Sequence, residues 1–146
     1  MMSMSYSYSD AGLELTKQFE GCKFEAYQDA GGAWTIGYGH TNGVFAGATC
    51  TQWQADKFLQ EDIQRVVDQI NRDVTVELTQ GEFDALVDFG FNLGCHALEN
   101  STLWKLLMAG DHEGAARQFP RWSYCNGVEV AGLLRRRLAE QAEFKS

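Results

Sequence analysis

Glycine is unevenly distributed along this chain of 146 residues, and its distribution constrains the fold more than any other feature. Seven of the 15 glycines lie between Gly21 and Gly47. Glycine adopts backbone conformations that other residues avoid, so this stretch is expected to make tight turns and close approaches rather than a packed core. From Thr51 onward, apolar residues recur at helical spacing. The chain therefore divides into a turn-rich first third and a helical remainder.

The turn-rich part predicts a short helix followed by a β-hairpin. Apolar residues at every fourth position and the helix-ending Gly21 predict a helix over residues 10–20. The run 23–28 contains aromatic residues, the run 33–38 contains aromatic and β-branched residues, and the two flank the glycine-containing turn at 29–32. This pattern is typical of a hairpin.

Two capping boxes introduce the helical part. Thr51 and Gln54 precede apolar residues at spacings of four, three and four, which predicts an amphipathic helix of about twenty residues. Thr79 and Glu82 open a second helix, which Gly94 is expected to end. Further helices are expected over residues 102–109, 111–119 and 132–144, the second of them ended by Pro120.

Strands followed by a run of helices indicate an α+β fold rather than an alternating α/β sheet. The prediction is one domain, 1–146, in which a long helix joins a small hairpin lobe to a larger helical lobe. Two lobes of this kind leave a cleft, where ligand sites are commonly found. The expected parts are a flexible lead-in (1–9), the hairpin lobe (about 10–50), the linking helix (about 51–72) and the helical lobe (about 73–146).

The charge balance and hydropathy exclude several classes of partner. A formal charge of -8 and a pI near 4.8 argue against a nucleic-acid partner, because nucleic-acid binding depends on cationic patches. The single basic run, 135–137, predicts a solvated helix face, with contact to an anionic ligand as the alternative. No membrane span or signal sequence is visible. We expect a soluble monomer without stable membrane insertion, cytoplasmic until something releases it.

The four cysteines are Cys22, Cys50, Cys95 and Cys125, and none forms a Cys-x-x-Cys pair. The three histidines are scattered, so a zinc site is not expected. Free thiols are the default interpretation. Disulfides formed after export are the alternative, and the sequence does not choose among the three full pairings.

The candidate catalytic residues lie in the stretch FEGCKFEAYQDAGGAWTIGYGHT, residues 19–41. Glu20 is expected at the C-terminal end of the first helix, where the helix dipole disfavours negative charge and favours a protonated acid. Asp29, in the hairpin turn, is expected to be solvated and ionised. Enzymes that cleave glycosidic bonds commonly use two carboxyl groups in unlike environments. Taken singly, each residue has a structural explanation, as a surface residue or a turn former.

Glu20, Asp29 and Thr35 are separated by eight and five residues within this stretch. This pattern resembles the catalytic segment of the phage-type lysozymes, the endolysins of glycoside hydrolase family 24. The resemblance covers nearly the whole chain after the first ten residues. It continues through LTQGEFDALVDFGFNLG at 78–94, STLWKLL at 101–107, RW at 121–122 and GLLRRRLAE at 132–140.

The resemblance implies a lysozyme-like fold and a muramidase, which hydrolyses the β-1,4 bond between N-acetylmuramic acid and N-acetylglucosamine in peptidoglycan during host lysis. In that scheme Glu20 is the general acid, and Asp29 and Thr35 hold and activate the attacking water, which inverts the anomeric carbon. An inverting pair needs carboxyl groups about 6.5–9.5 Å apart. No cofactor or metal is implied, because two carboxylates suffice for this reaction.

Other positions match the family less specifically. Phe91 is about as compatible with a core position, and Asn92 with a helix-end group. His40 is interpreted as a hydrogen-bonded structural residue. The two tryptophans of the helical part, Trp104 and Trp122, are interpreted as packed, with stacking on sugars as the alternative. The residues that match or adjoin the family's saccharide-binding positions are Thr41, Phe91, Asn92 and Thr102.

The chain departs from many endolysins in being acidic rather than basic, and it shows no apolar signal-anchor. The implied route is therefore synthesis in the host cytoplasm and release through a holin-type pore to the periplasm and the cell wall. Two alternative functions remain. A lytic transglycosylase would need only one essential acid and would form a 1,6-anhydro product. A wall-binding or scaffold protein would have kept the fold without the activity.

Overall fold

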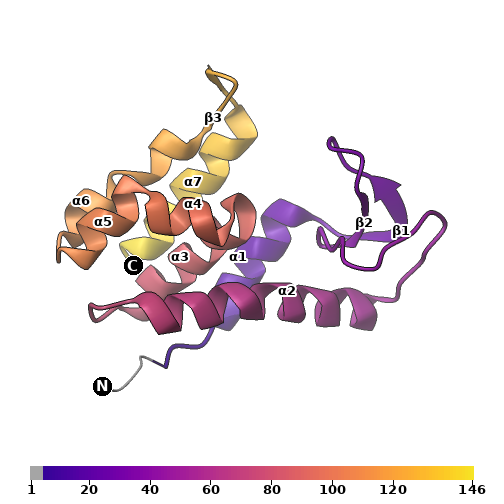
Figure 1. Ribbon diagram of the computed structural model, residues 1–146, viewed down its shortest axis with the longest axis horizontal. Helices are drawn as coiled ribbons and strands as arrows, with labels where there is room; N and C mark the ends of the chain where they lie inside the picture. Colours follow the sequence, from indigo (N-terminus) through magenta and orange to yellow (C-terminus); the bar gives the residue numbers. More distant parts are fainter. Residues whose placement is uncertain (1–4) are drawn as a thin grey trace. The chain divides into compact units, whose positions relative to one another are not determined.

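The computed structural model describes residues 5–146, which divide into two compact units (Figure 1). The hairpin unit comprises Thr16–Arg65, and the helical unit comprises the rest of the described chain. Helix α1 (Asp10–Glu20) begins in the helical unit and ends in the hairpin unit, and helix α2 (Gln52–Asp73) runs from the hairpin unit into the helical unit. Within residues 5–146, no helix combines the length and the hydropathy that crossing a membrane requires.

The hairpin unit contains the predicted β-hairpin. Strand β1 (Lys23–Gln28) pairs antiparallel with strand β2 (Trp34–Gly37), and Tyr27 lies opposite Thr35. The register shifts between Lys23 and Tyr27, so the strands are regular only next to their connecting turn. The prediction of a hairpin from the two aromatic runs is confirmed.

The long helix expected after Thr51 is α2, which contains 22 residues. Its capping box forms as expected: the backbone N–H of Gln54 donates to Thr51 Oγ1, and the backbone N–H of Thr51 donates to Gln54 Oε1. The end of β2 packs closely on this helix. A β-carbon built at Gly37 would lie 3.3 Å from the β-carbon of Ala55, so glycine permits this close approach.

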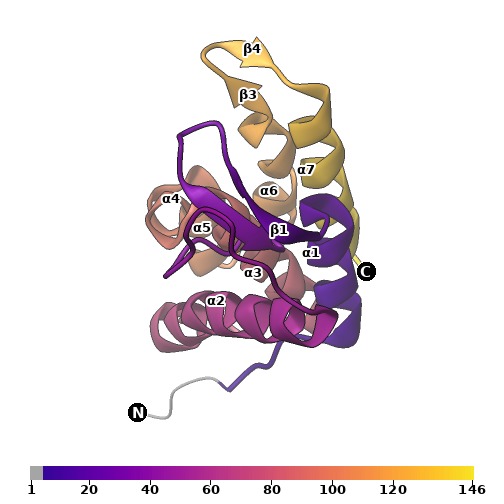
Figure 2. The same ribbon diagram turned by 90° about the vertical axis from the view of Figure 1, so that its right-hand side faces the viewer.

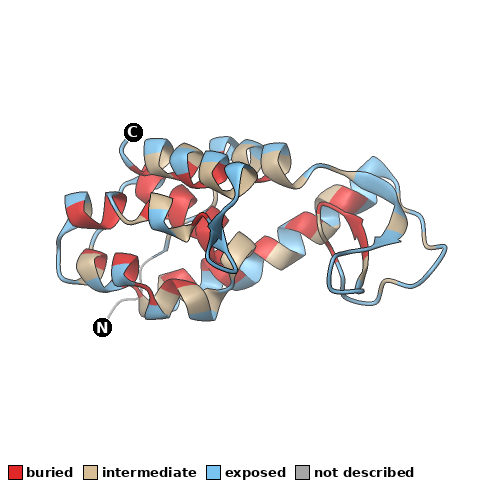
Figure 3. Cartoon of the chain, turned by 90° about the horizontal axis from the view of Figure 1, so that it is seen from above, coloured by how far each residue is buried: buried red, intermediate tan, exposed pale blue. Residues whose placement is uncertain are grey.

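The helical unit is built around helix α3 (Gln80–Leu93), of which Gly81 to Gly90 are all buried. The capping box of Thr79 and Glu82 is present, and α3 packs against helix α7 (Ala131–Phe144) (Figure 2). The buried residues of the chain are coloured red in Figure 3. The remaining elements of this unit are α4 (Cys95–Asn100), α5 (Thr102–Met108), α6 (His112–Ala116), the 3-10 helix η1 (Phe119–Trp122), β3 (Tyr124–Cys125) and β4 (Val128–Glu129).

The helix predicted over residues 111–119 is shorter than expected. Helix α6 ends at Ala116, and Pro120 lies in the first turn of η1 instead of ending α6. Proline suits this place because its fixed φ matches a helical turn and its missing N–H has no partner to lose there. Pro120 therefore begins a helical element here.

The prediction of a solvated face for residues 135–137 is wrong for two of the three arginines. Arg136 is 5% exposed and Arg137 is fully buried, whereas Arg135 is exposed. Arg136 donates two hydrogen bonds of 2.9 Å to the carboxylate of Asp88 on α3. The basic run therefore points largely into the helical unit, because α3 supplies a buried acid as its partner.

The expected flexible lead-in, residues 1–9, includes residues 1–4, which lie outside the described residues. Tyr6 is held in place in the helical unit. Its backbone N–H donates to Asn71 Oδ1 at 2.7 Å, its hydroxyl accepts from the backbone N–H of Leu78 at 2.8 Å, and its ring stacks on Phe83. The segment thus contributes packing from residue 6 onward.

Candidate active site

Glu20 is the last residue of α1 and is half-buried in the hairpin unit. Gly21 follows with a φ of 66°, a left-handed conformation that ends the helix as the sequence predicts. One turn earlier, the Lys17 ammonium lies 3.2 Å from the Asp56 carboxylate on α2. This ion pair and the glycine fix the end of the helix that carries Glu20.

A tight turn lies against the Glu20 carboxyl group. The backbone N–H groups of Ile36 and His40 each donate to the other residue's carbonyl oxygen at 2.9 Å, which closes the turn. Gly39 in this turn has a φ of 86°, and a β-carbon built there would lie 2.9 Å from Glu20 Oε1. Contacts of that length do not occur for real β-carbons, so glycine is needed for Glu20 to keep its position.

Asp29 shapes the hairpin turn with its own side chain. Its Oδ1 accepts hydrogen bonds of 2.9 Å from the backbone N–H groups of Gly31 and Ala33. Its backbone N–H donates to the Ala33 carbonyl oxygen, also at 2.9 Å. Oδ2 takes no part in these bonds, and the side chain is exposed. One oxygen therefore fixes the turn while the other can accept a hydrogen bond from water.

Thr35 lies on the same face of the hairpin as Asp29. Thr35 is opposite Tyr27 in the ladder, and the Asp29–Ala33 hydrogen bond places Asp29 opposite Ala33. Because side chains alternate between the faces of a strand, Asp29 and Thr35 share one face. Thr35 is 3% exposed, and its hydroxyl donates to the Ala33 carbonyl at 3.0 Å, which leaves the hydroxyl oxygen able to accept.

His40 is a structural residue of the hairpin unit. It is 5% exposed, its ring stacks on Phe58 with centroids 4.2 Å apart, and Nδ1 lies 2.8 Å from Asp62 Oδ2. Both partners belong to α2. The interpretation of His40 as a hydrogen-bonded structural group agrees with these contacts.

The four candidate saccharide-binding residues are divided between the units. Thr41 is exposed and lies in the hairpin unit, directly after the tight turn. Phe91 and Asn92 are half-buried at the C-terminal end of α3, and Thr102 is the exposed first residue of α5. Asn92 Oδ1 accepts a 2.7 Å hydrogen bond from Arg137 Nη2. The arginine that orients Asn92 was not found from the sequence, because the two residues are 45 positions apart.

The two tryptophans of the helical unit pack as the sequence favours. Trp104 is 8% exposed. The ring of Trp122 lies edge-on to Phe89, with centroids 5.4 Å apart. Both rings therefore contribute to the interior of this unit.

The thiols of Cys22 and Cys50 are half-buried, and burial raises the pKa of each. None of the four cysteines forms a disulfide, and Cys125 is the exposed one. Within residues 5–146, no group of three or more His, Cys, Asp or Glu side chains could hold a metal ion.

Known proteins resemble the chain over almost its whole length. The endolysin of Acyrthosiphon pisum secondary endosymbiont phage 1 is 44% identical over 142 residues, which cover 94% of this chain and 97% of the relative. The endolysin of Bacillus phage PZA is 41% identical over 94% of this chain, but the match spans only 55% of that longer protein. The structure of the muramidase domain of SpmX from Asticaccaulis excentricus matches with a TM-score of 0.92 and 38% identity, and covers 97% of this chain and 99% of that one.

These matches define the fold as lysozyme-like and α+β, with small antiparallel hairpins in a largely helical chain. The protein is a lysozyme-type glycoside hydrolase. The phage lysozyme family matches residues 17–140, and the chain belongs to this family. The matched range contains Glu20, Asp29, Thr35 and all four candidate saccharide-binding residues.

Proposed function

We propose that this protein is a phage endolysin of the muramidase type. It hydrolyses the β-1,4 bond between N-acetylmuramic acid and N-acetylglucosamine in bacterial peptidoglycan and so lyses the host cell. Family membership supports the reaction class. The arrangement of the hairpin unit supports the catalytic assignment of Glu20, Asp29 and Thr35. There the Glu20 carboxyl group lies against Gly39, and Asp29 shares a strand face with Thr35.

The three residues divide the reaction between them. Glu20 donates its proton to the glycosidic oxygen as the bond to the anomeric carbon breaks. Asp29 Oδ2 and Thr35 Oγ1 accept hydrogen bonds from one water, and Asp29 takes its proton as the water oxygen attacks the anomeric carbon. The attack comes from the face opposite the leaving group, so the product has inverted configuration.

In this proposal Thr41 in the hairpin unit, and Phe91, Asn92 and Thr102 in the helical unit, each contact the saccharide. The orientation of the Asn92 side chain supports this role. Its Oδ1 is occupied by Arg137, so the amide Nδ2 is the group left to donate a hydrogen bond to a sugar oxygen. Phe91 offers a half-buried ring that can pack on the apolar face of a sugar.

The protein acts as a monomer on one macromolecular partner, peptidoglycan. It is made in the host cytoplasm and reaches the wall through a holin-type pore. Expression in cells with and without a holin, followed by separation of periplasm from cytoplasm, tests this route. Recovery from the periplasm of cells without a holin would contradict it.

Digestion of purified peptidoglycan by the wild type and by Glu20→Gln tests the function. Mass spectrometry of the released fragments is expected to show hydrated, reducing muropeptides with the wild type and none with the variant. NMR of the first product is expected to show the inverted anomer. Anhydro products would identify a lytic transglycosylase instead, and no products from the wild type would mean that only the fold has been kept.

A further inference from the structure

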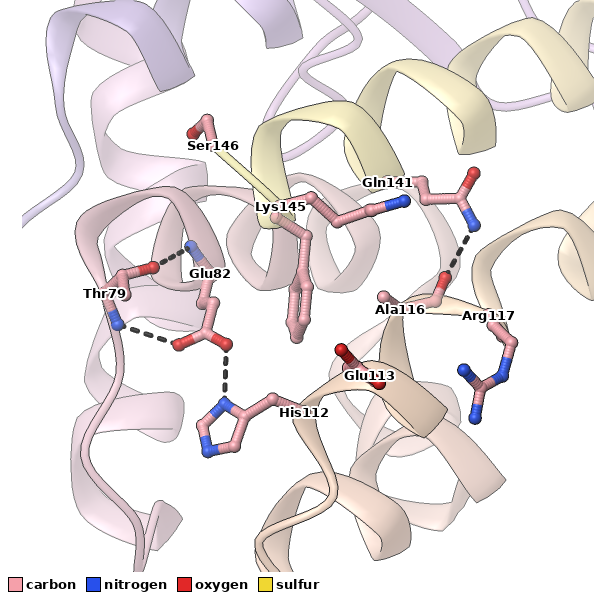
Figure 4. Close-up of a pocket in the computed structure, with 10 residues that line it drawn as sticks. Thr79, Glu82, His112, Glu113, Ala116, Arg117, Gln141, Lys145 and Ser146 are labelled. Carbon is pink, nitrogen blue, oxygen red and sulfur yellow. Dashed lines mark hydrogen bonds and ion pairs between the residues drawn. The ribbon is translucent and has the colours of Figure 1, made fainter.

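The helical unit contains a pocket that takes no part in the proposed reaction. Its volume is about 570 Å³, and its walls come from the start of α3, from α6 and from the end of α7 (Figure 4). Ligand pockets commonly have volumes of about 300–1,000 Å³. The apolar part of the lining is Ala116 and Phe144, which are 5% and 4% exposed. The pocket is large enough for a short peptide, and because the two apolar residues are nearly buried, its accessible surface is mainly that of the polar and charged residues.

The walls are held in place by their own hydrogen bonds. Gln141 Nε2 on α7 donates to the Ala116 carbonyl oxygen at 2.8 Å. On the α3 side, Glu82 Oε1 accepts from the backbone N–H of Thr79 at 2.9 Å, and Glu82 Oε2 lies 2.6 Å from His112 Nδ1. The Glu82 carboxylate is therefore fully engaged in the structure, and the pocket needs no ligand to form.

Three charged groups that line the pocket have no ionic partner in the described part of the chain. Glu113 and Arg117 are four residues apart, a spacing at which opposite charges commonly pair along a helix. Their charged atoms nevertheless do not come within 4.0 Å of each other, and Lys145 also lacks a carboxylate within that distance. Figure 4 shows Lys145 on the side of α7, and Glu113 and Arg117 on the side of α6.

We propose that this pocket binds short zwitterionic peptides. The peptide carboxylate is held by Arg117 and Lys145 and its amine by Glu113, all three of which are exposed. Arginine suits this task because its planar guanidinium binds a carboxylate through two parallel hydrogen bonds. The inference goes beyond the proposed hydrolysis and does not depend on it, because none of these residues belongs to the reaction described above.

Two sources supply peptides of this chemistry: the stem peptides of bacterial cell walls, which contain D-residues, and ordinary L-peptides. NMR titration of the whole ¹⁵N-labelled protein with a wall-stem tetrapeptide, and separately with an all-L tetrapeptide of equal charge, distinguishes them. Saturable shifts of the amide signals of His112, Gln141 and Lys145 are expected with at least one peptide. If neither peptide causes them at about 10 mM, the proposal is wrong.

Variants sharpen the test. Arg117→Gln and Lys145→Gln are each expected to weaken binding about tenfold, because each removes a charged hydrogen bond to the carboxylate. Lys105→Gln and Arg121→Gln remove exposed cations outside the pocket and are expected to leave the affinity unchanged. Equal affinities for all four variants would overturn the assignment.

The amine contact has its own control. Glu113→Gln is expected to weaken binding of the free peptide about tenfold and to leave binding of the N-acetylated peptide unchanged. An equal loss for both peptides would contradict the role given to Glu113. Glu20→Gln is expected to bind the peptides as the wild type does, so a failure of the proposed hydrolysis and a failure of this pocket can be told apart.

Discussion

The two units place their charged side chains in opposite settings. In the hairpin unit, Asp29 is exposed, and short-range backbone hydrogen bonds fix its position. In the helical unit, Asp88 is fully buried and paired with Arg136, 48 residues away in the chain. Aspartate thus stabilises a local turn in the hairpin unit and makes a long-range core contact in the helical unit.

The difference separates groups that can meet a ligand from groups that hold the core. An exposed carboxylate keeps an oxygen available for water, and its turn survives the loss of its charge. A buried carboxylate is shielded from water and neutralises a buried cation. When the carboxylate is removed, that cation becomes an uncompensated buried charge. Changes in the hairpin unit should therefore affect activity first, and changes in the helical unit should affect stability first.

Asp29→Asn tests whether a change in the hairpin unit affects activity before stability. The expected loss of activity is the largest effect of any variant considered. The asparagine Oδ1 can still accept from Gly31 and Ala33, so the turn is kept, but the base that activates water is lost. Hydrolysis of peptidoglycan should slow by a factor of about 10²–10⁴. The free energy of unfolding, measured in urea, should change by less than about 0.5 kcal/mol. A large loss of stability would show that the charge itself holds the hairpin.

Asp88→Asn tests whether the buried charge pair in the helical unit determines stability rather than activity. It leaves the Arg136 guanidinium buried without its carboxylate, so the free energy of unfolding should fall by about 3–5 kcal/mol. Activity per folded molecule, measured well below the melting temperature, should stay close to that of the wild type. Arg72→Gln is the control, because it breaks an ion pair at the surface, where the Arg72 side chain is 69% exposed, and it should matter little. Equal urea midpoints for both variants would contradict the argument.

Gly39→Ala tests whether the hairpin unit positions Glu20 through its backbone. The added β-carbon would meet Glu20 Oε1 and displace the carboxyl group, so hydrolysis should fall about 10²-fold. Gly43→Ala is the control. Gly43 has a φ of 73° and open space around it, so both variants carry similar backbone strain of about 1–2 kcal/mol. If both lose the same activity, strain rather than contact with Glu20 is responsible.

Local features of the sequence predicted the elements that depend on local physics. The hairpin, α2, α3 and their capping boxes follow from turn residues, apolar spacing and caps, which act over a few positions. The pattern of Glu20, Asp29 and Thr35 is also local, and it pointed to the family that the comparisons show. Their catalytic roles remain a proposal.

Features that depend on distant partners could not be predicted. Nothing in the basic run of α7 reveals that Asp88 faces it, and the spacing of Glu20 and Gly39 does not reveal their contact. The β3–β4 hairpin was missed for another reason. Its Asn126-Gly127 turn, with φ angles of 52° and 78°, is a strong hairpin signal, but the flanking strands are only two residues long.

The pH dependence of stability that Glu140 causes is the smallest expected effect and the finest test of the buried charges. Glu140 Oε1 lies 2.7 Å from Arg137 Nε, and both side chains are fully buried. Burial raises the pKa of Glu140 well above its ordinary value, and Asp88 adds to the rise, whereas Arg137 and Arg136 oppose it. The folded protein thus holds this proton more tightly than the unfolded chain does.

The sign of the pH dependence follows from that difference. A raised folded-state pKa contributes stability that is fully present below the unfolded pKa of about 4.3 and is lost as pH rises towards the folded value. Glu140→Gln removes this titrating group and keeps a neutral polar side chain beside Arg137. The free energy of unfolding of the variant relative to that of the wild type should therefore rise with pH, by at most about 1.36 kcal/mol per pH unit. Urea unfolding from pH 4 to 8 measures this slope, with Glu61→Gln in the hairpin unit as the exposed control. A constant difference between wild type and Glu140→Gln across the range would mean that Glu140 is ionised throughout, and that the helical unit tolerates four buried charges because they neutralise one another.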